Sequence, residues 1–212
     1  MKAKNKIPGA FWFLILIPLS IVTSSFLFFN GTKPLISSSA VHLVKSNQED
    51  TSISLFFVGD MMGHQSMIDA AKINAEDRYD YTSWFQFLKP YVILQDYAVA
   101  NLEVTLGGLP YSGYPQFSSP DSYAEAIQTA GFDFLITANN HSQDKGQKGL
   151  ERTIDVLDQL KMDHTGTFKT QNDRDKNYPF IKIIKGKKLA FLNYTYGTNG
   201  LEVKLPNIVN KI

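Results

Sequence analysis

Three apolar runs of the chain end in side chains that bind metals or transfer protons. The run that begins at Ile53 ends at Asp60, the run that begins at Tyr97 ends in Asn101-Leu102-Glu103, and a third ends in Asn139-Asn140-His141. A buried strand with polar residues at its carboxyl end is a common way for an α/β domain to deliver ligands to a site. We therefore expect these three strand ends to lie together.

Carboxylates, a carboxamide and imidazoles form a mixed oxygen and nitrogen donor set. Such a set suits manganese, iron or zinc better than calcium or magnesium, which prefer oxygen ligands alone. The sequence therefore predicts a divalent metal site or an oxyanion site at these strand ends. The candidate metal ligands are Asp60, His64, Glu103 and Asn140, and His141 is the candidate catalytic proton donor. The competing interpretation is that Asn140 and His141 only cap the following helix or close its loop.

Strands alternate with helices along the chain, which predicts an α/β domain with a mixed sheet. Hydrophobic periodicity predicts strands at 53–58, 97–102 and 133–138 and helices at 64–76, 83–95, 121–130 and 146–160. Two β-rich runs, 179–185 and 188–195, predict a hairpin. The loop 104–120 is rich in Gly, Pro and Tyr, and it either lines a substrate groove or packs onto the domain.

The N-terminus predicts a membrane anchor. Residues 1–9 carry three lysines, and residues 10–29 form an uncharged apolar run of about the length that crosses a bilayer as a helix. Positive charge before the run predicts a cytoplasmic N-terminus and a single-pass protein of the cell membrane, with the bulk of the chain extracytoplasmic. A cleaved signal peptide is the alternative, because residues 37–40 are small. Residues 30–51 predict a linker to a domain that begins at residue 52.

Charge and composition exclude several other functions. The chain has 212 residues and a formal net charge of +1, so no overall field would recruit nucleic acid. It has no cysteine, which excludes disulfides and thiolate-bound zinc. Its length suits one globular domain after the N-terminal extension.

The order of the motifs closely resembles that of the CapA family of poly-γ-glutamate capsule biosynthesis proteins. These motifs are Gly59-Asp60, Asn101-Leu102-Glu103, the segment ANNHSQDKGQKGL, His164-Thr165-Gly166 and LNYTYGTNG. The resemblance implies the fold of a calcineurin-like metallophosphoesterase, a four-layer α/β/β/α sandwich with a two-metal site at the strand ends. It also implies that Asp60 is a first-motif ligand and that Glu103 stands near a bridging carboxylate. Asn140 would bind the second metal and His141 would be the acid or transition-state stabiliser.

The sequence departs from the superfamily pattern in three places. His64 follows Asp60 by four residues rather than two, and Ser142 stands where an acid is preferred after the histidine, so Asp144 is the candidate to orient His141. The relatives place further histidines in the C-terminal half, but no histidine follows His164 here. We therefore expect residues 52–212 to be the N-terminal part of the sandwich, with its C-terminal part missing.

Three functions are compatible with these observations. The first is a membrane-anchored factor for biosynthesis or export of a poly-γ-glutamate-like capsule polymer. Its partners would be the membrane, a capsule polymer synthase complex and the anionic polymer. The second is a metal-dependent, phosphoesterase-like hydrolase of the calcineurin-like type. The third is an inactive, truncated surface domain.

Overall fold

A computed structural model of the chain describes residues 52–73 and 78–212. The predicted basic segment 1–9, membrane span 10–29 and linker 30–51 lie outside the described residues. Within the described ranges, no helix is long and apolar enough to cross a membrane.

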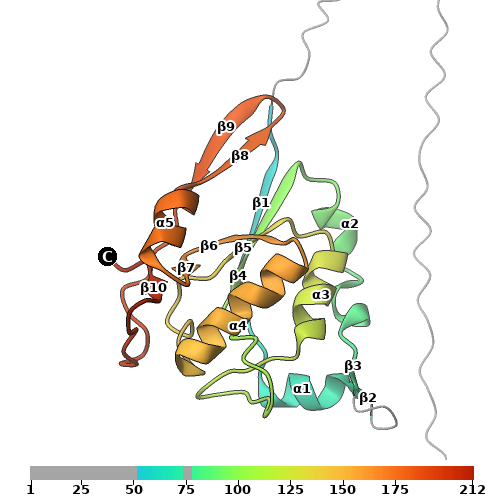
Figure 1. Ribbon diagram of the computed structural model, residues 1–212. Coiled ribbons are helices and arrows are strands. Elements are labelled where there is room, and N and C mark those ends of the chain that lie inside the picture. The colour runs from blue at the N-terminus through green and yellow to red at the C-terminus, as the bar shows by residue number, and fades with distance from the viewer. Residues whose placement is uncertain (1–51, 74–77) are drawn as a thin grey trace, which may run out of the picture. The chain divides into compact units, whose positions relative to one another are not determined.

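A four-stranded parallel sheet forms the centre of the domain (Figure 1). Its strands are β1 (Leu55–Met61), β4 (Tyr97–Leu102), β5 (Phe134–Ile136) and β6 (Asp163–Thr165), in the order β1-β4-β5-β6. The first three confirm the predicted strands, with small shifts at their ends. Every neighbouring pair is parallel, so all four carboxyl ends meet at one edge of the sheet.

Two helices cover one face of this sheet, α3 (Asp121–Thr129) and α4 (Gly146–Gln159), and both confirm predicted helices. The main core lies on this face and includes Ala98, Ala100, Ile127 and Leu157, each fully buried. Small alanines on β4 let the helices approach the sheet closely.

The opposite face is covered by an antiparallel hairpin, β8 (Phe180–Ile184) and β9 (Lys187–Phe191), as the sequence predicts. Alternate hairpin residues, among them Phe180 and Phe191, pack against Tyr97, Val99 and Phe134 of the sheet in a second core. The rings of Phe134 and Phe180 are stacked with centroids 4.6 Å apart. The described domain therefore has helices, a parallel sheet and a β-hairpin in three layers, which confirms the α/β class.

Two predicted helices are shorter than expected. The segment 64–76 forms α1 (Gln65–Ala71), after which the chain extends into β2 (Lys72–Ile73) and pairs with β3 (Arg78–Tyr79). The segment 83–95 forms η1 (Thr82–Phe85) and the single turn α2 (Lys89–Val92). Pro90 lies in the first turn of α2, and because proline has no N–H it cannot continue the preceding turn as an α-helix.

Strands β2, β3 and β6 were not predicted, nor were three elements further along the chain: β7 (Thr167–Phe168), α5 (Gln171–Asn177) and β10 (Ile208–Val209). Strands β7 and β10 pair with each other, and α5 has no buried residue. A helix without an apolar stripe gives no periodic signal. Its N-cap is nevertheless readable, because the Thr170 hydroxyl accepts a hydrogen bond from the Asp173 N–H at 3.0 Å.

Candidate functional site

The three predicted strand ends meet at the carboxyl edge of the sheet. A bulge at Gly59 shifts the register of β1, so that Val58 pairs with Ala100 but Asp60 pairs with Asn101. Strand side chains alternate between faces, so without this extra residue Asp60 would point to the helix side with Phe56 and Val58. The bulge instead places Asp60 next to Asn101.

Asn101 links the two predicted carboxylates. Its amide nitrogen donates to Asp60 Oδ1 at 2.9 Å and to Glu103 Oε2 at 2.7 Å. Burial and the neighbouring Asp60 carboxylate raise the pKa of Glu103 to about 7, although the Asn101 hydrogen bond and the charge of His141 act in the opposite direction. Two carboxylates held together in this way attract a proton or a cation.

The Asn139–Asp144 turn is an almost completely buried polar segment. Asn139 donates to Asn101 Oδ1 at 3.0 Å and to the Leu102 carbonyl at 2.8 Å, and its own Oδ1 accepts from the His141 N–H at 3.0 Å. The Ser142 hydroxyl donates to the Thr137 carbonyl and accepts from the Asn139 N–H. Asn139 and Ser142 thus fix the backbone of the turn, while Asn140 and His141 project their side chains from it.

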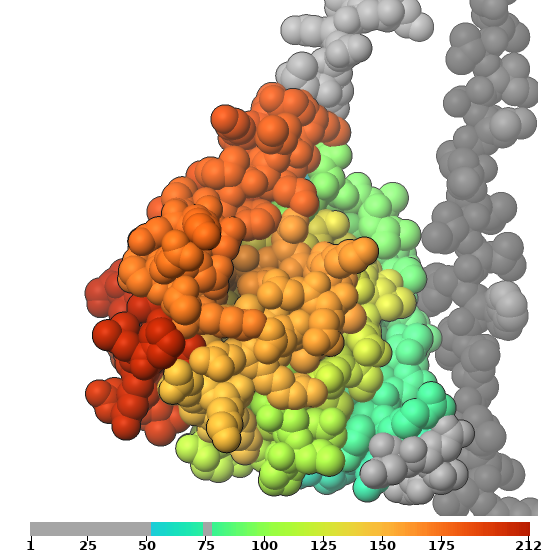
Figure 2. All heavy atoms as spheres, viewed as in Figure 1, coloured from blue at the N-terminus to red at the C-terminus, as the bar shows by residue number. Residues whose placement is uncertain are grey.

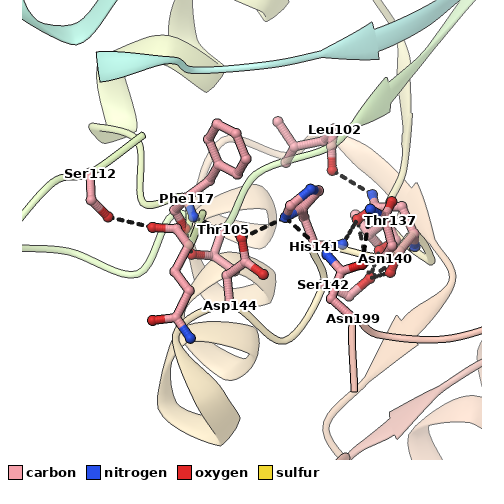
Figure 3. Close-up of polar contacts among 12 residues, drawn as sticks. Leu102, Thr105, Ser112, Phe117, Thr137, Asn140, His141, Ser142, Asp144 and Asn199 are labelled. Atoms are coloured by element: carbon pink, nitrogen blue, oxygen red, sulfur yellow. Dashed lines mark hydrogen bonds and ion pairs between the residues drawn. The ribbon is translucent and has the colours of Figure 1, made fainter. Parts of the chain in front are cut away.

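Asp144 orients His141, as predicted. The ring Nδ1 of His141 lies 2.7 Å from Asp144 Oδ2, and the same carboxylate oxygen accepts the Phe117 N–H at 2.7 Å (Figure 3). With Nδ1–H donated to Asp144, Nε2 is the nitrogen that can accept a proton or, once protonated, donate one. Burial raises the pKa of Asp144, opposed by the two hydrogen bonds.

Phe117 separates the two histidines of the site region. Its ring is fully buried and contacts His141 edge to face at 4.7 Å between centroids, while on another side it meets His64 at 5.2 Å. His64 is exposed and precedes α1 as its N-cap residue. The structure therefore brings Asp60, Glu103, Asn140 and His141 to one edge of the sheet, and it places His64 beside the site behind an aromatic ring.

Two asparagines of the segment after β9 complete the site, and neither was among the predicted site residues. Asn193 accepts the Ala138 N–H at 2.6 Å and donates to the Ala138 carbonyl at 3.1 Å, so its side chain replaces a neighbouring strand at the end of β5. Asn199 has a left-handed backbone (φ 51°) and lies 3.5 Å from His141 Nδ1 and 3.4 Å from the Asn140 amide nitrogen. The available signal was the motif LNYTYGTNG, in which both residues occur.

A comparison with known families gives the context of these residues. The family model described as "Bacterial capsule synthesis protein PGA_cap" matches residues 54–209, which span the whole site from Asp60 to Asn199. The chain belongs to this family. The match confirms the resemblance drawn from the sequence motifs.

Two curated relatives are similar to the chain. Capsule biosynthesis protein CapA of Bacillus anthracis is 26% identical over 164 residues, which cover 74% of this chain and 38% of the relative. PGA biosynthesis protein CapA of Bacillus subtilis (strain 168) is 26% identical over 162 residues, covering 72% of this chain and 39% of the relative. The chain thus spans about two fifths of the length of these capsule biosynthesis relatives.

In the described part of the domain, this edge offers two carboxylates but not a complete set of charged metal ligands. Asp60 and Glu103 offer carboxylate oxygens, and the Asn101 amide holds the two side chains together. No group of three or more His, Asp or Glu side chains that could hold a metal occurs among the described residues. Further ligands would therefore have to be carboxamide oxygens such as that of Asn140, or water.

Proposed function

We propose that this protein is a membrane-anchored factor that assembles or exports an anionic, poly-γ-glutamate-like capsule polymer. Family membership over residues 54–209 is the observation that carries the proposal. The printed names of both relatives refer to capsule or PGA biosynthesis. The apolar run 10–29, preceded by three lysines, supports anchoring in the cell membrane with the domain outside, where a synthase complex would deliver the polymer.

In this proposal the network at the carboxyl edge of the sheet is the working site. His141 stands on a turn whose buried polar side chains are mostly hydrogen-bonded within the domain, and Asp144 fixes the orientation of its ring. A side chain is held in one orientation in this way where it must meet a ligand in a defined geometry. His141 would donate a proton to, or hydrogen-bond, an oxygen of the polymer or of its activated end.

The test is polymer display in the producing cell. His141→Ala should abolish capsule polymer at the cell surface while the protein remains at its normal level in the membrane fraction. Asp158→Asn is a matched control, because Asp158 also pairs with a histidine, His164, but on the exposed side of α4. Normal surface polymer in the His141→Ala cells would overturn the proposed role of the site.

A metal-dependent, phosphoesterase-like hydrolase is the second candidate function. The carboxylate pair Asp60–Glu103, next to a histidine with a fixed tautomer, is the observation that favours it. Manganese, iron or zinc at this pair would lower the pKa of a bound water and neutralise charge at the attacked centre. Asp60, Glu103 and Asn140 would hold the cation, His64 would join them only after a rearrangement around Phe117, and His141 would protonate the leaving group.

Metal binding separates the two candidates. Calorimetric titration of the full chain with Mn²⁺ or Zn²⁺ should give saturable binding that Asp60→Asn removes and that Asn140→Ala weakens. Hydrolysis of a chromogenic phosphodiester would then require both the metal and His141. Absence of saturable binding would overturn the hydrolase and leave a capsule factor without metal chemistry.

A further inference from the structure

The edge of the sheet opposite the candidate site carries a cluster of charged side chains. A cleft of about 650 Å³ opens there, where β4, β5 and β6 begin and the β8–β9 hairpin crosses them. Among its lining residues are six charged side chains: Asp96, Asp133, Lys161, Asp163, Lys182 and Lys185. We call this edge, together with the tip of the hairpin, the amino-end face.

The acids of the amino-end face accept hydrogen bonds from the first residues of strands or from the residues just before them. Asp96 accepts from the Ser54 N–H at 2.8 Å, Asp133 accepts from the Ala98 N–H at 2.8 Å, and Asp163 accepts from the Tyr97 hydroxyl at 2.8 Å. Each carboxylate is therefore fixed by a hydrogen bond at the amino end of the sheet.

Two lysines of the same face pair with these acids, Lys185 with Asp96 at 2.8 Å and Lys182 with Asp163. Lys161 and Lys185 are exposed at the cleft, and Lys187 and Lys188 are exposed at the hairpin tip. With Lys182, the face carries five lysines against three aspartates, an excess of two positive charges in a chain whose net charge is +1. Figure 2 shows the hairpin as the orange-red upper tip of the domain.

Large apolar side chains lie among these lysines. Ile183 on β8 lines the cleft and is 63% exposed. Ile93 and Leu94, which follow α2, are 57% and 76% exposed. Ile93 borders the same cleft, because a Cβ on the lining residue Gly131 would come within 2.8 Å of its Cγ2 atom. Isoleucine and leucine side chains surrounded by lysines are typical of surfaces that rest on anionic lipid.

The chain also enters the domain at this face. Lys185 donates to the Ser52 carbonyl at 3.2 Å, and Ser52 is the first described residue. Only the 22 residues 30–51 separate the predicted membrane span from this point. Fully extended, these residues span at most about 75 Å, a length that allows this face to contact the bilayer.

We propose that the amino-end face rests on the anionic phospholipid surface of the membrane in which the chain is anchored. The inference rests on the proposed membrane anchoring and adds to it a defined orientation. The lysines contact lipid phosphates, and Ile93, Leu94 and Ile183 enter the headgroup region. The candidate site then faces away from the bilayer at a height of about 20 Å, the length of a strand of six or seven residues. A polymer leaving the membrane would approach the site from the side of the domain that faces the bilayer.

The experiment uses the full chain in vesicles and exploits the absence of cysteine. Ile183→Cys carries an environment-sensitive fluorophore at the amino-end face, and Lys148→Cys carries it on the exposed first turns of α4, at the other end of the domain. The vesicles contain phosphatidylcholine with or without phosphatidylglycerol, and a lipid bearing a spin label in its acyl chain acts as the quencher. Flotation of the vesicles reports anchoring separately.

The expected result is quenching at position 183 and none at position 148, in vesicles that contain phosphatidylglycerol. Lys187→Gln with Lys188→Gln should reduce the quenched population by roughly five-fold per lysine. Flotation without quenching at position 183 would overturn the lipid-facing orientation and leave anchoring intact. Failure to float would overturn anchoring and this inference with it, and equal quenching without phosphatidylglycerol would overturn the role of the lysines.

Discussion

The Asp144 carboxylate should stabilise the domain far more than a similar carboxylate on its surface. Its Oδ2 atom holds both His141 Nδ1 and the Phe117 N–H at 2.7 Å, with the Asp144 side chain 1% exposed. Asp144→Asn can keep an acceptor oxygen at the position of Oδ2, but it removes the negative charge that strengthens both of these hydrogen bonds. Both hydrogen bonds become neutral, which costs about 1 kcal/mol for each bond, and the easier burial of a neutral side chain offsets part of this cost.

We therefore expect Asp144→Asn to lower the free energy of unfolding by about 2 kcal/mol. For a protein of this size that corresponds to a fall in Tm of roughly 4–8 °C. The measurement is thermal unfolding of the full chain in detergent micelles, followed by circular dichroism. Because the Phe117 amide ties loop 104–120 to the site, chymotrypsin should also cleave the variant faster within this loop.

Asp158→Asn is the control, since it breaks a histidine pair in which the aspartate side chain is 61% exposed. Exposed ion pairs contribute at most about 1 kcal/mol, so Tm should change by less than roughly 3 °C. Equal shifts in the two variants, or an unchanged Tm in Asp144→Asn, would refute the argument that Asp144 holds the loop and the histidine together.

Three further outcomes are expected. Folding raises the pKa of Glu103 from 4.5 to about 7, so the folded protein favours the protonated carboxyl. The resulting contribution to the free energy of unfolding is fully present below pH 4.5 and is lost as the pH rises to about 7. Thermal unfolding between pH 4 and 8 should show this loss, and Asp60→Asn should reduce it; an unchanged slope would contradict the assignment. Gly166→Ala should abolish soluble expression, because the backbone has φ 116° and the new Cβ would collide with the Asn193 side chain and the Ala138 backbone. Gly186→Ala, with φ 75° and open space around it, should cost only about 1 kcal/mol in chemical denaturation; equal effects of the two substitutions would exclude the collision. Arg152→Lys should lower the free energy of unfolding by about 1 kcal/mol in the same assay, because lysine cannot reproduce the bidentate contact with Asp121 at 2.7 and 2.8 Å. An unchanged denaturation midpoint would show that this contact contributes nothing to stability.

The sequence was most informative where strands run through the core. The apolar run before Asn101 is almost wholly buried as β4, and because parallel strands share one carboxyl edge, the three polar strand ends could be assigned to one site without coordinates. The pairing of Asp144 with His141 was predicted on other grounds, because Ser142 stands where an acid is preferred and Asp144 is the next carboxylate along the chain.

The contacts that the sequence did not reveal are those made by side chains in place of backbone. The Asn193 side chain makes the hydrogen bonds to the Ala138 backbone that a neighbouring strand would make, although the two residues are 55 positions apart. An asparagine in a loop carries no periodic signal that distinguishes this role from an ordinary turn. The register shift at Gly59 is equally hidden, because one glycine before an aspartate is compatible with both a regular and a bulged strand. The short α2 turn was overestimated because its apolar pattern continues through Pro90.

The Asn193 contact also sets an order for folding. The turn that carries His141 obtains its last backbone partners from a residue that follows the whole β8–β9 hairpin, and Asn199 reaches His141 across 58 positions. Contacts of such separation pay a large loop-closure entropy and form late. A chain that is still being synthesised can therefore form its parallel strands before the site is complete. Substitutions that slow docking of the hairpin should delay the appearance of function without altering any residue that performs it.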